Sequence, residues 1–237
     1  MKEVKIGGTV LGDGSVKICV PVCPRDKLEL ASELEFAVGS GCDIVEWRGD
    51  YWAEKRKKPF GAIKKRLGEK PLLFAYRTSK EGGLGTDDDR EYYAENKNAI
   101  KSKRVDAVDL EFSKPAWVID GLMALAKRNN VKVMLSRHLT EGFITKDEMT
   151  ASLILMQNKG CHLTKLALYA RDEDHAREII GAASEMHEKY AKAPFITVGM
   201  GEAGKITRYA KPFYGSSMTY AKGLNETAPG QLPVSEL

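Results

Sequence analysis

Apolar and polar positions alternate along this chain in a repeating order. Short apolar runs are typical of buried strands, and most are followed by a longer segment in which apolar residues recur every three to four positions, as on one face of a helix. Strands are predicted at residues 16–22, 43–48, 71–77, 105–112, 131–137, 160–169, 195–198 and 213–220. Helices are predicted at residues 26–38, 55–67, 87–103, 115–129, 145–159 and 173–190.

Local end signals support several of these helices. Asp26 can cap the first helix, and Gly39 stops it. Pro115 stands in the first turn of its helix, where a missing N–H costs little. Thr145 and Glu148 have the spacing of a capping box, so a helix is expected to begin there.

The beginning of the chain has a different pattern. Residues 4–11 and 16–22 are apolar runs across the turn at residues 12–14, which predicts a β-hairpin. Counted from residue 16, eight strands then alternate with helical or Gly-rich segments, which implies parallel strands with right-handed crossovers. Eight such strands favour a closed (β/α)8 barrel of the α/β class, with an open doubly wound sheet as the alternative. No linker divides the pattern, so a single domain over residues 1–237 is expected.

Composition excludes several classes of protein. The chain has 43% hydrophobic and 30% charged residues, a mean hydropathy of -0.35, and no apolar run near the roughly 20 residues of a membrane span. Its start lacks the apolar region of a signal peptide, so we expect a cytoplasmic protein with no membrane partner. The four cysteines include no CxxC pair and have no histidine nearby at ligand spacing, so reduced thiols and no metal site are expected.

The net charge of +4 indicates only a mild preference for acidic partners. Basic residues gather at 55–58 and 64–66, around Phe60, Ile63 and Leu67 at helical spacing. This is typical of the solvated face of an amphipathic helix. Aromatic residues are not interleaved with these cations, so we do not expect nucleic-acid binding.

One lysine is out of place in this pattern. Lys165 lies in the middle of an apolar strand, where period two puts it on the same face as Leu163 and Ala167. Lysine is seldom buried without a reason. Desolvation lowers the pKa of an amine and makes it a nucleophile at neutral pH. The alternative is a lysine that reaches solvent or pairs with a carboxylate.

Other charged and polar residues stand where the predicted strands end. In a barrel these carboxyl ends meet at the face that carries the chemistry. The residues at these ends are Glu46, Arg48, Arg77, Glu81, Glu111, Ser136, His138, Lys165 and Met200. The segment at residues 199–204 matches GxGxxG, but Ile206 replaces the Ser or Thr of a Walker A loop, and no ribose-binding acid follows, so nucleotide binding is not expected.

Taken together, these strand ends resemble the type I 3-dehydroquinate dehydratase family, the Schiff-base dehydratases of the shikimate pathway. Six motifs in order carry the resemblance, at residues 43–48 (DIVEWR), 76–83 (YRTSKEGG), 136–138 (SRH), 165–167 (KLA), 200–208 (MGEAGKITR) and 228–231 (APGQ). The resemblance implies a (β/α)8 barrel whose N-terminal hairpin caps the barrel bottom. It also implies a homodimer that needs no metal or cofactor.

The resemblance implies a role for each residue of the site. Lys165 would form an imine with 3-dehydroquinate, His138 would act as general base and acid, and Glu81 would orient the imidazole. Arg208 would hold the substrate carboxylate. The remaining residues would bind ring hydroxyls, balance charge, line the site or close a loop at residues 223–230 over the ligand: Glu46, Arg48, Arg77, Met200, Thr227 and Gln231.

Some positions depart from the family pattern. Arg137 and Leu139 flank the histidine in place of an aromatic and an acidic or amide residue, and Thr207 and Thr227 stand where serine is usual. Only six residues follow Gln231, so the eighth helix is expected to be cut short. Two rivals remain: another Schiff-base barrel of the aldolase or transaldolase kind, and a catalytically silent barrel that serves as a binding protein.

Overall fold

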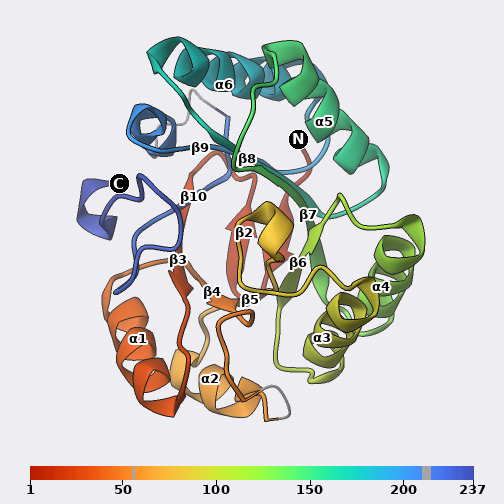
Figure 1. Ribbon diagram of the computed structural model, residues 1–237, viewed down its shortest axis with the longest axis vertical. Helices are drawn as coiled ribbons and strands as arrows, with labels where there is room; N and C mark the ends of the chain where they lie inside the picture. The colour runs from red at the N-terminus through yellow and green to blue at the C-terminus, as the bar shows by residue number, and fades with distance from the viewer. Residues whose placement is uncertain (55–56, 210–214) are drawn as a thin grey trace.

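A computed structural model describes residues 1–54, 57–209 and 215–237. Eight strands run parallel around a barrel, with the helices outside it (Figure 1). In spatial order they are β10 (Met218–Tyr220), β3 (Lys17–Val22), β4 (Ile44–Arg48), β5 (Leu72–Ala75), β6 (Ala107–Glu111), β7 (Lys132–Leu139), β8 (Leu163–Tyr169) and β9 (Phe195–Met200). The predicted (β/α)8 barrel is confirmed.

The barrel closes between β9 and β10 through a few bonds rather than a regular ladder. The Ser217 N–H donates to the Phe195 carbonyl at 2.9 Å, and the Thr197 N–H donates to the Ser216 hydroxyl at 3.0 Å. This closure excludes the open doubly wound sheet. The predicted eighth strand begins too early, because the described strand starts at Met218, and residues 213 and 214 lie outside the described part.

The helices cover the outside of the barrel. They are α1 (Lys27–Gly39), α2 (Phe60–Leu67), α3 (Asp89–Lys101), α4 (Ala116–Arg128), α5 (Lys146–Asn158) and α6 (Glu173–Glu185), the last continued by a π-helical turn, η2 (Met186–Tyr190). Asp26 caps α1 through the N–H groups of Leu28 and Glu29, and the capping box of Thr145 and Glu148 is present at α5. No helix of the described residues is long and apolar enough to cross a bilayer.

The predicted basic helix begins later than expected. Its start at residues 55 and 56 lies outside the described part, and α2 begins only at Phe60, after Pro59. Lys58 is not on a solvated helix face, because its side chain is buried in an ion pair with Glu95 at 3.0 Å. The second group of basic residues, 64–66, lies in the last turn of α2, where the helix dipole favours cations.

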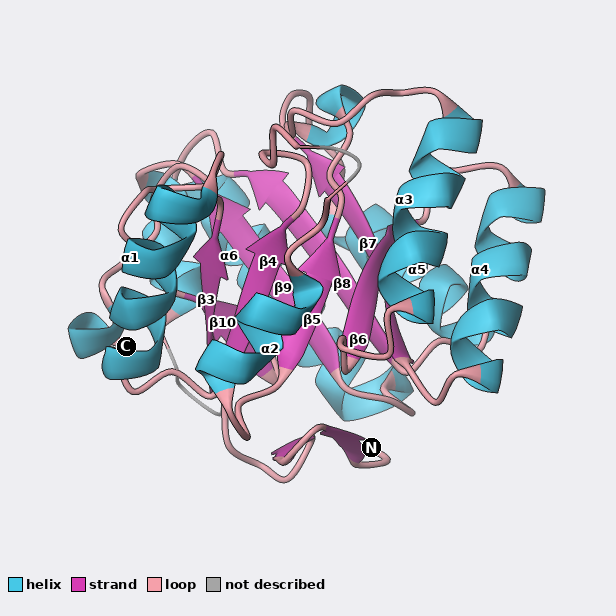
Figure 2. Cartoon of the chain, turned by 90° about the horizontal axis from the view of Figure 1, so that it is seen from below, coloured by secondary structure: helices cyan, strands magenta, loops and turns pink. Residues whose placement is uncertain are grey.

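The hairpin is where the sequence-based prediction was wrong. β1 (Val4–Ile6) pairs antiparallel with β2 (Thr9–Leu11), while β3 pairs parallel with β4 and β10. The turn lies at Gly7, whose φ of +54° suits glycine, and not at residues 12–14. This hairpin lies under the amino ends of the barrel strands (Figure 2), as the resemblance implied.

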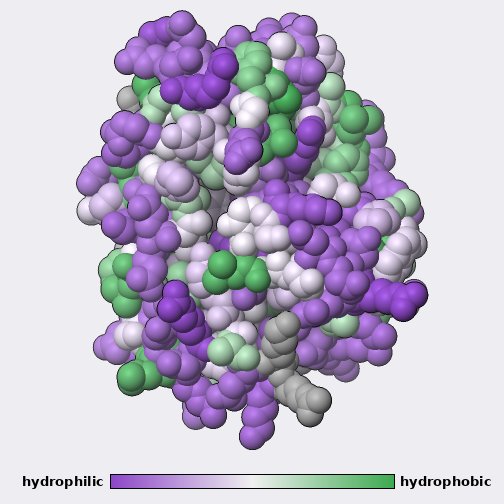
Figure 3. Space-filling model, in the orientation of Figure 1, coloured by the Kyte–Doolittle hydropathy of each residue, from purple (hydrophilic) through white to green (hydrophobic). Residues whose placement is uncertain are grey.

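The interior of the barrel is apolar at the bottom and charged at the top. Ile6 and Leu11 of the hairpin pack with inward residues of the strands, such as Ile44, Leu73 and Leu163. A second, larger core fills the space between the barrel and the helices. Because the hairpin and these side chains close the bottom, access to the interior is from the carboxyl ends of the strands, a face that is mostly hydrophilic (Figure 3).

Two short 3-10 helices lie at the carboxyl ends of the strands: η1 (Ser79–Glu81) follows β5, and η3 (Ala203–Arg208) follows β9. After β10, residues 221–237 form a loop and one further 3-10 helix, η5 (Val234–Glu236). Within this described segment no α-helix covers β10.

Candidate active site

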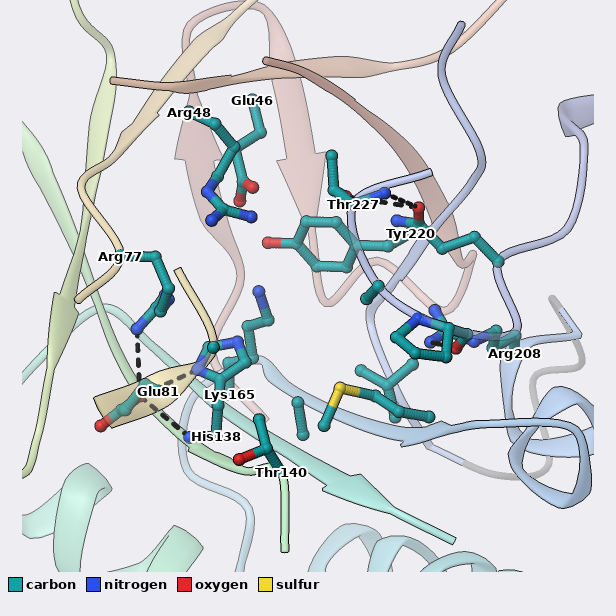
Figure 4. A pocket seen from close by; sticks show the side chains of 17 residues that line it. Glu46, Arg48, Arg77, Glu81, His138, Thr140, Lys165, Arg208, Tyr220 and Thr227 are labelled. Carbon is teal, nitrogen blue, oxygen red and sulfur yellow. Dashed lines mark hydrogen bonds and ion pairs between the residues drawn. The ribbon is translucent and has the colours of Figure 1, made fainter. Parts of the chain in front are cut away.

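A cavity opens among the loops at the carboxyl ends of the strands. Together with its mouth, which is open to solvent, it holds about 670 Å³ of empty space. All ten residues that the sequence singled out for the site line it: Glu46, Arg48, Arg77, Glu81, His138, Lys165, Met200, Arg208, Thr227 and Gln231 (Figure 4). The lining also includes Tyr220 and Thr140, which the sequence analysis did not name.

Lys165 points into this cavity from β8. It pairs in register with Ser136 on one side and Ile196 on the other, and it is only 6% exposed. Its Nζ lies 3.7 Å from Asp109 Oδ2 and 3.9 Å from the ring centroid of Tyr220. Burial lowers the pKa of Lys165 below its ordinary value, although Glu46 and Asp109 oppose the shift. The alternative that this lysine reaches solvent is therefore wrong. The alternative that it pairs with a carboxylate agrees with Asp109 at 3.7 Å.

Asp109 lies beneath the lysine, fully buried on β6. It accepts hydrogen bonds from Arg77 Nη2 at 2.6 Å and from the Ser136 hydroxyl. Burial alone would raise its pKa, but Arg77 and Lys165 outweigh burial and lower the pKa of Asp109 to about 2. A fixed negative charge therefore lies next to the amine.

Arg77 connects the acidic residues of the site. Its guanidinium contacts Glu81 at 3.1 Å, Asp109 at 2.6 Å and Glu111 at 3.3 Å, and it donates to the Ser136 hydroxyl at 3.1 Å. Burial opposes its charge, but the three carboxylates raise the pKa of Arg77 well above its ordinary value. Since protein groups already occupy these donors, Arg77 orders the carboxylates of the site.

His138 and Glu81 meet across the mouth from β7 and η1. Glu81 Oε2 accepts from the His138 backbone N–H and lies 3.0 Å from Nδ1, and the Ser113 hydroxyl donates to Glu81 Oε1 at 2.6 Å. Burial, Arg77 and Lys165 lower the pKa of His138 well below its ordinary value. A carboxylate only accepts, so the neutral ring carries its proton on Nδ1 and leaves the Nε2 lone pair free.

Two residues of β4 form another wall. Arg48 donates from Nε and Nη2 to both oxygens of Asp50, at 2.9 and 2.7 Å, which fixes the guanidinium plane. Glu46 is 4% exposed, and its Oε2 has no hydrogen-bond partner among the described residues. A buried acceptor of this kind is suited to a donor on a ligand.

Arg208 faces the same cavity from the end of η3. It is 2% exposed, donates from Nη2 to the Pro229 carbonyl at 3.2 Å, and its Nε has no partner within the described residues. Burial lowers the pKa of Arg208 to about 10, so the group remains a cation at neutral pH. Unlike Arg48 and Arg77, it has no carboxylate at ion-pair distance in the described chain, and an anionic ligand would supply one.

The GxGxxG segment serves to place Arg208. A Cβ on Gly204 would lie 2.4 Å from the Gly199 carbonyl carbon, so only glycine permits this close turn. The Thr207 hydroxyl accepts from the Gly199 N–H and donates to the Gly204 carbonyl, both at 2.7 Å. The glycines therefore allow backbone packing rather than nucleotide binding.

Thr227 and Gln231 lie on the loop that follows β10. Gln231 Oε1 accepts from the Thr227 N–H at 2.9 Å and from its hydroxyl at 3.3 Å. Lys222 donates from its N–H to the Leu232 carbonyl at 2.7 Å and closes the base of the loop. The Gly201 N–H donates to the Pro229 carbonyl at 3.0 Å, which ties the tip to the β9 loop.

Arg137 and Leu139 do not line the cavity, although they flank His138. Arg137 turns outward and donates to the Ser152 hydroxyl on α5 at 3.1 Å. Period two of the strand explains this, because neighbours of an inward residue point outward. Their departure from the family pattern therefore changes the outer layer and not the lining.

Two functional candidates, Asp109 and Tyr220, were missed. Asp109 lies two residues before Glu111 on the same face of its strand, and Glu111 was recognised at the strand end, so the signal was present. Tyr220 gave no such signal, because an aromatic at a strand end is ordinary. Among the described residues, no three His, Cys, Asp or Glu side chains gather as a metal site.

Comparison with known proteins identifies the family. The model of the type I 3-dehydroquinase family matches residues 18–237. This chain belongs to the type I 3-dehydroquinase family. It is 36% identical to the 3-dehydroquinate dehydratase of Clostridium novyi (strain NT), over 100% of this chain and 96% of that protein, and 35% identical to that of Bacillus subtilis (strain 168), over 100% and 95%.

Solved structures agree with this membership. The type I 3-dehydroquinate dehydratase of Clostridium difficile, solved with covalently modified comenic acid, superposes with a TM-score of 0.94 at 29% identity, over 99% of this chain and 94% of that one. The 3-dehydroquinate dehydratase of Geobacillus kaustophilus HTA426 gives 0.93 at 26% identity, over 99% and 93%. The family resemblance drawn from the six motifs is confirmed.

Proposed function

We propose that this protein dehydrates 3-dehydroquinate to 3-dehydroshikimate through an imine on Lys165. The observation that carries the proposal is one cavity in which a buried amine, a neutral imidazole and a guanidinium without a carboxylate partner face the same space. Family membership supports dehydration over carbon–carbon cleavage by an aldolase. The chemistry of the lining also disfavours a silent binding protein, because Lys165, His138 and Glu81 are all present.

The first step needs a nucleophilic amine. Desolvation lowers the pKa of Lys165 and so raises the neutral fraction that attacks the ketone. Loss of water then gives an iminium cation at the same nitrogen. Asp109, at 3.7 Å, and the face of Tyr220 stabilise that charge.

The second step removes a proton from the carbon next to the iminium. The free Nε2 lone pair of His138 accepts this proton, and the electron pair moves towards the iminium nitrogen to give an enamine. The imidazolium then returns its proton to the departing β-hydroxyl, which leaves as water while the electron pair flows back from nitrogen. Hydrolysis of the conjugated imine releases the product and the free amine.

The cavity walls fit the rest of the substrate. Arg208 takes the carboxylate in a charge-assisted pair, since no protein carboxylate of the described chain neutralises it. Glu46 and Arg48 accept and donate at ring hydroxyls, and Met200 packs against the ring. Thr227 and Gln231 cover the ligand from the loop after β10.

Borohydride trapping tests this proposal. Reduction during turnover should add the mass of the bound ligand to the peptide that contains Lys165, and Lys165→Met should abolish both labelling and turnover. Lys127→Met, on the exposed face of α4, is the matched control and should behave as the unaltered protein. An unlabelled preparation that still dehydrates the substrate would end the imine assignment.

We also propose that residues 1–237 act as a single domain in a cytoplasmic homodimer that needs no cofactor, since the iminium itself provides the electron sink. The family resemblance supports this assembly. Light scattering on the purified protein measures its mass against 26.2 kDa per chain, and a monomer at working concentration would contradict the dimer.

A further inference from the structure

Tyr220 closes the cavity beside the reactive nitrogen. It ends β10, where it pairs in register with Cys19 of β3, and it is 5% exposed. The Lys165 Nζ lies over its ring, 3.9 Å from the centroid. Figure 4 shows the ring reaching across the cavity, with its hydroxyl on the side of Lys165 and Arg48. Tyr220 therefore contacts the atom that reacts.

The hydroxyl of Tyr220 is buried beside the Glu46 carboxylate, and it makes no hydrogen bond of ordinary length and angle in the described chain. Glu46 Oε2 has no such bond there either. Burial, with Glu46 close by, raises the pKa of Tyr220 well above its ordinary value, so the phenol keeps its proton. A buried donor without a partner is unfavourable, and packing alone would be served as well by a phenyl ring. The hydroxyl is therefore placed to donate to a ligand atom.

We propose that Tyr220 is a further catalytic residue, whose hydroxyl relays a proton from the Lys165 nitrogen to the substrate oxygen during imine formation. This inference rests on the proposed function, because it assigns a group to the first step of that reaction. The oxygen concerned is carried on the carbon that bonds Nζ, so it lies next to the amine that the ring of Tyr220 contacts.

The relay balances in atoms and charge. The neutral Lys165 amine attacks the carbonyl carbon as the π pair moves to oxygen. Tyr220 donates its proton to that oxygen and takes one from the nitrogen, so the phenol is restored. A proton taken up from solvent then protonates the resulting hydroxyl, the carbon–oxygen bond breaks, and water leaves an iminium that keeps one N–H.

The ring and the hydroxyl of Tyr220 contribute separately. The ring face attracts the cationic nitrogen through its quadrupole, and this attraction persists in a phenylalanine. Only the hydroxyl relays a proton. Tyr220→Phe therefore removes the proposed chemistry while it preserves the shape and the cation–π contact, whereas Tyr220→Leu removes both.

The test measures how fast the imine forms in single turnovers quenched with borohydride. In Tyr220→Phe, labelling of Lys165 should be roughly a hundredfold slower, which is the usual effect of losing a positioned proton donor. In Tyr220→Leu it should be slower still. Substrate affinity, measured in a Lys165→Met background where no imine forms, should change little when Tyr220→Phe is added. Tyr93→Phe, outside the cavity, is the control and should label at the normal rate.

The outcomes separate the two proposals. Equal labelling rates in Tyr220→Phe and the unaltered protein would overturn the role of the hydroxyl and leave the imine mechanism standing. Failure of the unaltered protein to label at all would overturn the proposed function itself. A melting temperature close to normal in Tyr220→Phe distinguishes slow chemistry from a damaged fold.

Discussion

Glu81 Oε2 holds His138 at two points, by the backbone N–H and by Nδ1, each at 3.0 Å. The first bond fixes the end of β7 against η1, and the second sets the tautomer of the ring. A single oxygen thus fixes both the position of the imidazole and which of its nitrogens is free to take a proton. Arg77 and Ser113 in turn hold the carboxylate.

His138→Ala should reduce turnover by roughly a hundredfold to ten-thousandfold, because a positioned acid–base group is lost. Lys165 remains buried and nucleophilic, so slow imine formation should persist and be detected as borohydride labelling. The measurement is steady-state turnover beside mass spectrometry of the trapped protein. A near-normal rate would remove His138 from the mechanism.

Glu81→Gln should act in the same direction as His138→Ala, but less strongly. The amide still occupies the site, yet it no longer carries the charge that supports the imidazolium. In free energy, the double variant should lose less than the sum of the single variants, because the two groups act as a unit. Full additivity would place Glu81 on the substrate and not on His138.

The pH dependence of kcat/KM should report the groups that must be deprotonated. Lys165 reacts as a neutral amine, so kcat/KM should rise with pH through the lysine pKa, at a midpoint below the ordinary 10.5 because burial lowers it. Asp109 raises the pKa of both Lys165 and His138. Asp109→Asn should therefore move the rise to lower pH.

Asp120→Asn is the matched control for that profile, because Asp120 lies on α4 in an exposed ion pair with Lys159. Its profile should coincide with that of the unaltered protein, since solvent screens the lost charge. A shift to higher pH in Asp109→Asn would show that the carboxylate does not stabilise the lysine cation.

The loop after β10 depends on a glycine. Gly230 has a φ of +80°, and a Cβ there would lie 2.4 Å from the Gly201 carbonyl oxygen. Gly230→Ala should displace Thr227 and Gln231 and lower kcat/KM by about tenfold, equivalent to about 1.4 kcal/mol. Gly142→Ala has the same backbone strain at φ +81° with nothing near its Cβ, and should leave kcat/KM close to normal. Equal losses would point to backbone strain alone.

The sequence predicts which residues lie at the site better than it predicts the hydrogen bonds and ion pairs between them. Strand ends are readable because period two and the βα alternation are local, and these placed Lys165, His138 and Arg48 at one face, whereas Arg208 was assigned only through the family resemblance. The bonds of Arg77 to Asp109 and Glu111 are not readable, since they join the segment after β5 to β6 through barrel register.

The hairpin error has a similar cause. Glycines mark turns at residue 7 and at residues 12–14, and both turns are plausible in the sequence alone. Which turn joins two paired strands depends on which neighbouring strands the folded chain brings beside each other. β3 gains two parallel neighbours, β4 and β10, only when the barrel closes, and this non-local pairing outweighs a local hairpin with residues 4–11.

The capping box at α5 gives a prediction for stability alone. The Glu148 N–H donates to the Thr145 hydroxyl at 3.4 Å, and Glu148 Oε2 accepts from the Thr145 N–H at 2.7 Å. Thr145→Ala should lower the free energy of unfolding by about 1 kcal/mol, or about 2–4 °C in melting temperature. Ser32→Ala, on the exposed side of α1 and away from any cap, should change it by less than about 0.5 kcal/mol. Because Thr145 lies outside the cavity, kcat should stay normal in both variants. A lower kcat in Thr145→Ala would show instead that α5 helps to position His138 through β7.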